Sequence, residues 1–289
     1  MSLSLIHESV MIKVMEFVIP PPMKLLDWIG EERILIPGHH LSMNPNAVGF
    51  LEKHIDQIDW SHFTSNENAF HILEQNLDKI KYPFLSQNTN HNAMLFLEKN
   101  PDKIDWMVLS RNPNAIRILE KNLDKIYWDC LSTNPNAIHL LEKNLDRIYW
   151  YSLCTNTNAI HLLEHNLNKV YWYYLCMNIN AIPLIEKHLD KVNWYSLSSN
   201  PNAIHLLEQH KDKIEWDHLS MNTSIDAIRI LEQNIDKVNW FYLSMNPSAI
   251  HLLEQNQDKI DWVQFTMNPS IFVVDQVGYS IEKNKWVVQ

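Results

Sequence analysis

The chain has 289 residues, a formal net charge of −10 and a hydrophobic content of 46%, so it has enough apolar material for a packed fold. The acidic balance argues against a surface for nucleic-acid phosphates, which usually needs a basic stripe. No apolar run approaches the ~18 residues of a membrane-spanning helix.

The first residues of the chain and its three cysteines indicate the cellular compartment in which the protein acts. The first residues lack a basic stretch and a small-residue cleavage site, so we expect no signal peptide. Three cysteines, Cys130, Cys154 and Cys176, form no disulfide framework and are typical of a reducing environment. We therefore expect an intracellular protein that is not secreted.

In chain order, the sequence divides into a non-repetitive segment, a tandem array and a second non-repetitive segment. Residues 1–37 are expected to cap the array at its N-terminal end. Residues 38–261 hold ten units that start at a tryptophan slot, which Gly38 and Tyr82 occupy in two early units. Residues 262–289 contain a partial unit, from Trp262, and a C-terminal cap. Solenoids need such atypical ends to cover their last apolar layer.

Each unit predicts two short helices, most clearly after Trp128. The first covers about 128–133, with Trp128 and Leu131 one turn apart. Asn134 is a good N-cap for the second helix, and Pro135 suits its first position. Because helices this short are marginal alone, stacking must hold them. We predict an all-α solenoid of about ten 22–24-residue two-helix repeats with non-repeat terminal caps.

Two units, 82–105 and 216–239, have 24 residues instead of 22. Both gain their extra residues directly before the alanine, where NTNHNA and NTSIDA replace NPNA. Insertions that recur at one point predict a loop or a helix start, where extra chain is tolerated.

Three slots hardly change between units and are expected to form structural ladders. Tryptophan should supply the bulk of the core between layers. Asparagine should cap the second helix, with a hydrogen bond to the preceding repeat as a further option. Alanine should lie where successive second helices approach to ~8–10 Å. In mid-array the slots are Trp106, Trp128, Trp150, Trp172 and Trp194; Asn112, Asn134, Asn156, Asn178 and Asn200; and Ala137, Ala159 and Ala181.

Charged residues and histidines also recur at fixed slots. Glutamate in every unit, and Lys or Arg in a later slot, predict a solvated face with weak ion pairs between repeats. Histidine follows Ala-Ile, as at His139 and His161, and successive layers hold these rings too far apart for shared metal ligation. The sequence also lacks a phosphate-binding loop and a nucleophile–base signature. We expect no metal, no cofactor and no catalytic residue.

The units differ most around the tryptophan, where tyrosines cluster in mid-array. They are Tyr127, Tyr149 and Tyr171 before it, Tyr151, Tyr173 and Tyr195 after it, and Tyr174. Tyrosine is favoured at interfaces because it combines contact area with a polar tip. Other units place Asp, Asn, Lys or Glu before the tryptophan, which favours an exposed slot. The seven are candidate partner-binding residues; the alternative is half-buried packing between first helices.

The repeat WxxLSxNPNAIxLLExNLDKI, the lead-in KLLDWI at 24–29 and the tail NPSIF at 268–272 resemble the repeat proteins of giant DNA viruses of the mimivirus kind. The resemblance covers nearly the whole chain. It implies an α-helical array of mostly unassigned function, with no catalytic residues to carry over, in the host cytoplasm or the virion. The 24-residue units and the tail, which stops soon after NPSIF, depart from the pattern.

Together these observations predict a non-enzymatic scaffold that binds a protein partner. One alternative is a structural virion component that associates with itself. Another is a nucleic-acid-binding array with one unit per base, which the negative charge and the scarcity of arginine oppose.

Overall fold

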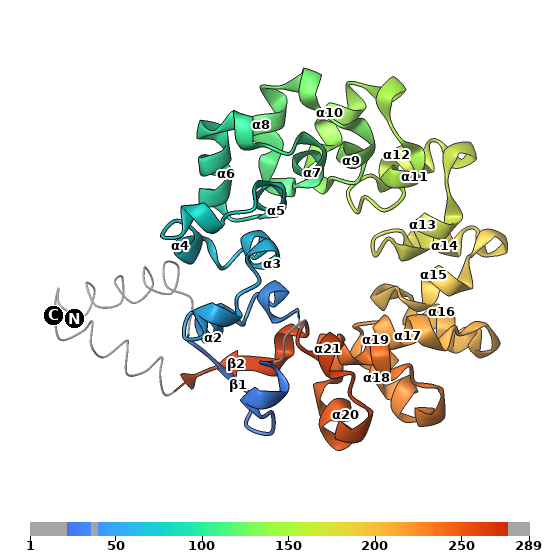
Figure 1. Cartoon of the computed structure of the whole chain (residues 1–289). Helices are drawn as coiled ribbons and strands as arrows, with labels where there is room; N and C mark the ends of the chain where they lie inside the picture. The colour runs from blue at the N-terminus through green and yellow to red at the C-terminus, as the bar shows by residue number, and fades with distance from the viewer. Residues whose placement is uncertain (1–21, 36–39, 277–289) are drawn as a thin grey trace, which may run out of the picture.

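The computed structural model describes residues 22–35 and 40–276, and helical turns account for about 65% of them. The repeats stack side by side and form a ring (Figure 1). This confirms the predicted all-α solenoid of two-helix repeats. Gly38, most of the expected N-terminal cap and the end of the expected C-terminal cap lie outside the described residues.

The first helix of each unit belongs to the inner layer of the ring, and these inner helices pack on one another in succession (Figure 1). They are α3 (Trp60–Ser65), α5 (Tyr82–Gln87), α7 (Trp106–Arg111), α9 (Trp128–Ser132), α11 (Trp150–Leu153), α13 (Trp172–Met177), α15 (Trp194–Ser198), α17 (Trp216–Met221), α19 (Trp240–Ser244) and α21 (Trp262–Phe265). In the earliest unit a 3₁₀ turn at Leu41–Met43 takes this place.

The second helices form the outer layer. They are α2 (Val48–Leu51), α4 (Phe70–Leu73), α6 (His91–Lys99), α8 (Ile116–Glu120), α10 (Ile138–Glu142), α12 (Ile160–Glu164), α14 (Ile182–Glu186), α16 (Ile204–Gln209), α18 (Ile225–Glu232) and α20 (Ile250–Gln255). In units with the NPNA motif a 3₁₀ turn such as Pro135–Ala137 leads into the helix. In the 24-residue units, α6 and α18 begin earlier and replace this turn, so the predicted insertion point is a helix start.

The core is aliphatic, with leucine and alanine in its most deeply buried slots. The alanines 137, 159 and 181 are 0% exposed, as are Leu131 and Leu153. The expectation that tryptophan supplies the bulk of the core is wrong. Trp106, Trp128, Trp150, Trp172 and Trp194 are only partly buried and pack against the edge of the core. An alanine slot brings backbones too close for an indole between them, so the rings lie at the margin of each layer.

Lysine or arginine side chains cover several of these indole rings. The Lys169 ammonium lies 4.3 Å from the centroid of Trp150, and the Arg147 guanidinium lies 5.1 Å from that of Trp128. In these units the basic slot at the end of the unit shields the ring that begins the same unit, through a cation–π contact.

The recurring asparagine ties every layer to the one before it. Asn156 donates from Nδ2 to the carbonyls of Ser132 and Asn134, at 3.0 and 2.8 Å. Its Oδ1 accepts the backbone N–H of Asn158 at 3.0 Å, which caps the start of the next turn. Both expected roles, the cap and the bond to the preceding repeat, are therefore confirmed. Because Asn156 is 1% exposed, these bonds form away from water, where leaving a partner unpaired is costly.

The same asparagine bonds close the ring. Asn44, in the earliest unit, donates to the carbonyls of Thr266 and Asn268 at 3.1 and 2.9 Å. Asn46 donates to the carbonyl of Pro269 at 2.9 Å. The asparagines of all eleven units therefore form one continuous circle, which we call the Asn ring: Asn44, Asn66, Asn88, Asn112, Asn134, Asn156, Asn178, Asn200, Asn222, Asn246 and Asn268.

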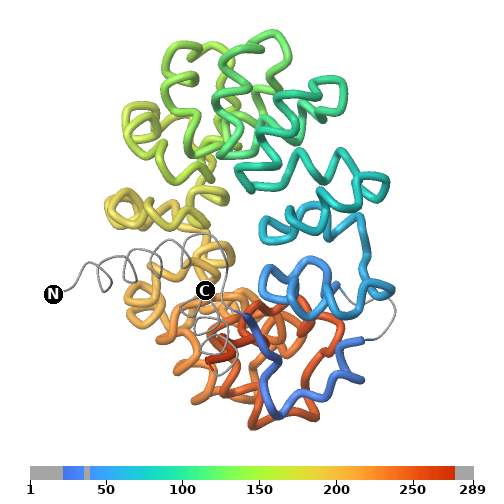
Figure 2. The backbone as a smooth tube through the Cα atoms, turned by 90° about the vertical axis from the view of Figure 1, so that its left-hand side faces the viewer, coloured from blue at the N-terminus to red at the C-terminus, as the bar shows by residue number. Residues whose placement is uncertain are grey.

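Residues at the two ends of the array also cover each other. Strand β1 (Met23–Leu25) pairs antiparallel with β2 (Phe272–Val274), and both views show the two ends side by side (Figures 1 and 2). Trp28 lies 5.7 Å from Phe265 between ring centroids, and Arg33 lies over Trp262. The first and last apolar layers thus bury each other.

Among the residues of the ring that the structure describes, no helix combines the length and the apolar character needed to cross a bilayer.

Candidate binding surface

The tyrosines that precede the tryptophan occupy the N-cap position of an inner helix. In five other units this residue is Asp or Asn and caps the helix, whereas Lys81 and Glu215 hold the slot without a side-chain cap. Asp105, for example, accepts the backbone N–H of Val108 at 3.1 Å, and Asn193 accepts that of Ser196 at 3.0 Å. A tyrosine ring cannot reach back in this way. Helices α9, α11 and α13, which start after Tyr127, Tyr149 and Tyr171, accordingly have no side-chain cap.

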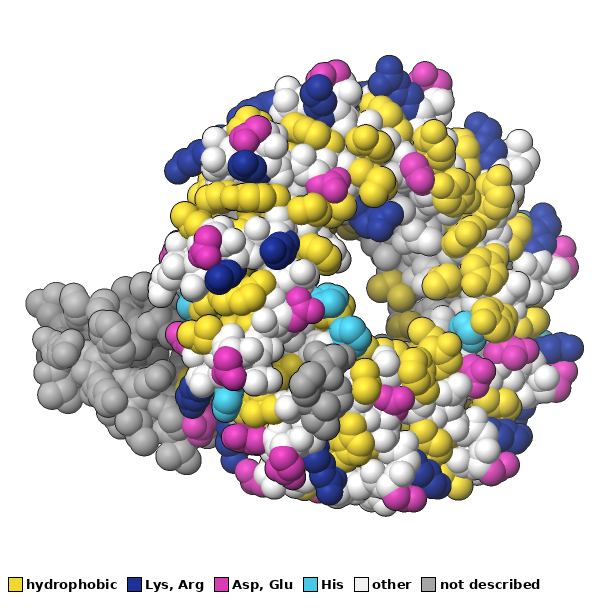
Figure 3. Space-filling view, viewed as in Figure 1, with side chains coloured by type: hydrophobic (Ala, Val, Ile, Leu, Met, Phe, Trp, Pro, Cys, Tyr) yellow, Lys and Arg dark blue, Asp and Glu magenta, His cyan; other side chains and the backbone are white. Residues whose placement is uncertain are grey.

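All seven candidate tyrosines are exposed. Their exposed fractions are 53% for Tyr127, 48% for Tyr149, 38% for Tyr151, 54% for Tyr171, 43% for Tyr173, 37% for Tyr174 and 47% for Tyr195. We call this set the tyrosine patch. The structure thus excludes deep burial of these rings. Figure 3 shows hydrophobic side chains, tyrosine included, gathered over the part of the ring that Figure 1 labels α11 to α15.

Six of the seven rings contact one another across repeats. Tyr151 lies at the centre, with centroids 6.3 Å from Tyr149, 6.2 Å from Tyr171 and 6.0 Å from Tyr174. The chain of contacts continues from Tyr174 to Tyr173, with ring centroids 5.1 Å apart, and from Tyr173 to Tyr195, with ring centroids 6.4 Å apart. Aromatic pairs in edge-to-face and stacked geometries stabilise one another by about 0.5–1.5 kcal/mol. Six rings of the patch therefore form one connected aromatic surface.

Two polar residues contact this aromatic chain. Asp129 accepts hydrogen bonds from the hydroxyls of Ser152 and Tyr151, and its carboxylate raises the pKa of Tyr151. The His218 ring contacts Tyr195, the last tyrosine of the chain, and burial lowers the pKa of His218. His218 Nδ1 is buried without a hydrogen-bond partner in the described part of the chain. The neutral imidazole thus extends the apolar surface.

The layer beneath the tyrosine patch contains both cysteines that replace serine. In other units the serine hydroxyl accepts the backbone N–H that precedes the next tryptophan, as Ser132 does from Tyr149 at 3.1 Å. Cys154 Sγ accepts the N–H of Tyr171 at 3.3 Å in the same way. Burial raises the pKa of both thiols, that of Cys176 to about 11. All three cysteines are free and buried, so they act as small packing residues.

On the outer face, a glutamate of one unit forms a hydrogen bond with a histidine of the next unit. His139 Nε2 lies 2.8 Å from Glu120 Oε1, and His161 Nε2 lies 2.9 Å from Glu142 Oε1. Each pair joins one unit to the preceding one, and about half of each side chain is exposed. Within residues 22–35 and 40–276, no group of three or more His, Cys, Asp or Glu side chains could hold a metal ion.

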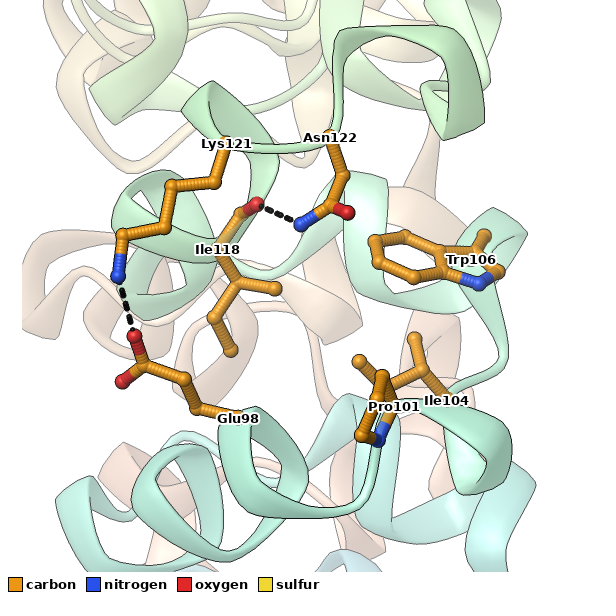
Figure 4. Close-up of a pocket in the computed structure, with 7 residues that line it drawn as sticks. All are labelled: Glu98, Pro101, Ile104, Trp106, Ile118, Lys121 and Asn122. Carbon is orange, nitrogen blue, oxygen red and sulfur yellow. Dashed lines mark hydrogen bonds and ion pairs between the residues drawn. The ribbon is translucent and has the colours of Figure 1, made fainter.

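A pocket of about 340 Å³ opens on the outer side between the units that begin at Tyr82 and Trp106 (Figure 4). Ile104 and Trp106 form its apolar wall, and Glu98 and Lys121 pair at 2.6 Å across its edge. Pro101 lines it in the slot where most other units have leucine or isoleucine. Since the two charged groups satisfy each other, the pocket presents no unpaired charge to a ligand.

Sequence reasoning missed the ring closure, the cation–π contacts and this pocket. The cation–π contacts have a sequence signal, because the basic slot recurs 19 residues after most tryptophans, as in Trp150 and Lys169. The pocket has a weaker one, the proline at position 101. Comparison with known proteins adds nothing further, since no family model, curated protein or solved structure matches the chain.

Proposed function

We propose that the chain is a non-enzymatic scaffold that binds a protein partner through the tyrosine patch. One observation carries the proposal. Three consecutive units replace a capping Asp or Asn by an exposed tyrosine, and a lost N-cap costs about 0.5–2 kcal/mol per helix. Nothing in the stacking of the repeats requires that exchange. Exposed, mutually supported aromatic residues are what a protein interface uses as anchors.

Repetition supports the non-enzymatic part of the proposal. The same glutamate, histidine and lysine slots recur around the ring, whereas acid–base or nucleophilic catalysis needs one unique constellation. The three free, buried cysteines support an intracellular site of action. The resemblance to giant-virus repeat proteins supports a viral chain that acts in the host cytoplasm or the virion.

The test is affinity capture from the producing cell, with mass spectrometry and a nuclease-treated control. The variant carries Tyr127→Asn, Tyr149→Asn and Tyr171→Asn together, because asparagine caps the helix at this slot in other units. We expect this variant to fold and to lose its partners. A matched control changes Leu123, Leu145 and Leu189, which are exposed on the turns after the outer helices, to Asn.

Four outcomes would contradict the proposal. Unfolding of the tyrosine variant would assign the rings to the core. Full retention of every partner by a folded variant would move the binding surface elsewhere. Captured material that disappears after nuclease treatment would favour the nucleic-acid alternative, and concentration-dependent self-association in sedimentation would favour the virion component.

A further inference from the structure

The exposed face of the inner helices forms the inner wall of the ring. An α-helix turns about 100° per residue, so the residues one, two and five places after the tryptophan slot share one face. On α13 these are Tyr173, Tyr174 and Met177, which are exposed, whereas Leu175 and Cys176 on the opposite face are buried. The second helices lie outside the inner helices in the ring (Figure 1), so we take this exposed face of the inner helices as the wall turned towards the central opening.

The inner wall is nearly free of charge although the chain has 24 Lys and Arg and 34 Asp and Glu residues. In the units from Trp60 to Trp262, these three positions hold only Arg111, Asp129 and Asp217 as charged residues. Aromatic residues and methionine share these positions with uncharged small and polar residues such as Ser and Thr. Depletion of charge with enrichment of Tyr, Phe and Met characterises the core of a protein interface. Methionine also adapts its shape to a partner.

The three charged residues on the wall differ in their availability. The Arg111 guanidinium is directed at the sulfur of Cys130, 3.8 Å away. Asp129, on α9, and Asp217, on α17, lie on the inner helices that flank those carrying Tyr151, Tyr173 and Tyr195. Asp129 accepts the Ser152 hydroxyl and Asp217 accepts the Asn239 amide at 2.9 Å, but neither carboxylate forms an ion pair within the described residues. An occupant that covers them should bring positive charge, since burying a carboxylate without a compensating cation is unfavourable. A nucleic-acid phosphate would meet the wrong sign.

The spacing of the rings indicates an extended chain. Tyr173 and Tyr195 hold the same slot in neighbouring units, and their ring centroids are 6.4 Å apart. Alternate side chains on one face of an extended polypeptide are ~6.6 Å apart. Two residues of such a chain would therefore advance by one unit of the ring. A second copy of the ring is excluded as the occupant, because its convex outer surface cannot enter the concave wall.

We propose that the inner wall from α9 to α17 binds an extended segment of a partner protein, in which apolar side chains alternate and Lys or Arg stands at both ends. This inference rests on the proposed function and names the chemistry of the partner. Three apolar side chains would meet Tyr151, Tyr173 and Tyr195 in turn. The two cations would meet Asp129 and Asp217, which lie four units apart.

The experiment uses the full-length protein and the labelled peptide Lys-Ser-Leu-Ser-Leu-Ser-Leu-Ser-Lys in fluorescence anisotropy. One control peptide has Glu at both ends. A second, Lys-Leu-Ser-Ser-Leu-Ser-Ser-Leu-Lys, keeps the composition and changes the leucine spacing from two to three. We expect the first peptide to bind at least about ten-fold more tightly than either control. Asp129→Asn with Asp217→Asn should remove most of this preference over the Glu peptide, whereas Glu142→Gln on the outer face should not.

Equal binding of all three peptides, no binding of any, or an unchanged preference in the Asp129→Asn, Asp217→Asn variant would overturn the inference. The capture experiment separates this failure from failure of the proposed function. If the triple tyrosine variant loses its cellular partners while the peptide does not bind, the scaffold proposal stands and the extended basic segment is wrong. If that variant keeps its partners as well, both proposals fail.

Discussion

The side-chain amide nitrogen of Asn44 lies 2.9 Å from the carbonyl oxygen of Asn268, although 224 residues separate them in the sequence. In the middle of the array, Asn156 makes the same bond to Asn134 at 2.8 Å across 22 residues. The interface between the first and last units therefore uses the same chemistry as every interior interface.

This equivalence predicts the cost of breaking the Asn ring. Asn44→Ala and Asn156→Ala each remove two donated bonds and one accepted bond from a buried site, so each should lower the free energy of unfolding by about 2–4 kcal/mol. Urea denaturation of both variants measures this. In an open array Asn44 would sit at a fraying end, so a cost far smaller than that of Asn156→Ala would contradict closure.

The alanine slot should not accept a larger side chain. Ala159 is 0% exposed, and Ala159→Leu should overpack the layer and cost about 1–3 kcal/mol. His161→Leu, two residues later on an exposed position, is the matched control and should change stability little. Thermal unfolding of the two variants compares them, and a neutral Ala159→Leu would mean that the slot has free space.

Replacing a tyrosine of the patch by a capping residue should stabilise the fold. Tyr149 starts α11 without a side-chain cap, so Tyr149→Asn should gain up to about 0.5–2 kcal/mol in urea denaturation. Tyr173→Asn lies inside α13 and should give no such gain. A loss of stability in Tyr149→Asn would show that the Tyr149 ring contributes more by its contact with Tyr151 than a cap does.

The buried thiols should make stability depend on alkaline pH. Burial raises the pKa of Cys176 from its ordinary value of 9.0 to about 11, so the folded state holds the proton more tightly than the unfolded chain. The stability from the neutral thiol is complete below about pH 9 and is lost as the pH rises towards 11. Cys176→Ser, with the residue that most units have here, should show a smaller decline. An identical pH profile for both proteins would refute this.

The same burial should protect the cysteines from reagents. At pH 8 the folded protein should react slowly with a disulfide reagent, and denaturation should release all three thiols at once. Rapid reaction of Cys154 or Cys176 in the folded protein would show that the layer beneath the tyrosine patch opens readily.

The sequence predicts local structure well because every unit repeats it. Asn134 before Pro135 signals a cap, and the structure places the cap there. The alanine slot similarly predicts a position with no space for a larger side chain, and Ala137 is fully buried. The prediction that tryptophan fills the core was wrong, because hydrophobicity and spacing do not distinguish a ring inside a layer from a ring at its margin that a lysine covers.

Ring closure could not be predicted from any one unit. It depends on the small rotation between successive layers, summed around the array, and no single residue encodes that sum. The exposure of the tyrosines could be argued from the Asp and Asn that replace them in other units. Their mutual contacts, such as Tyr151 with Tyr174, needed the curvature that brings inner helices together.

Closure also bears on how this gene can change. Tandem copies of one short sequence repeat are prone to gain or lose a copy during replication. An open solenoid can accommodate such a change, because each repeat contacts only its neighbours. Here the Asn44 amide must meet the carbonyls of Thr266 and Asn268, so one unit more or less would leave those buried groups apart. We therefore expect the shape of the whole molecule to constrain the copy number, because a chain with an altered count cannot form the same closing bonds even when each remaining unit is intact.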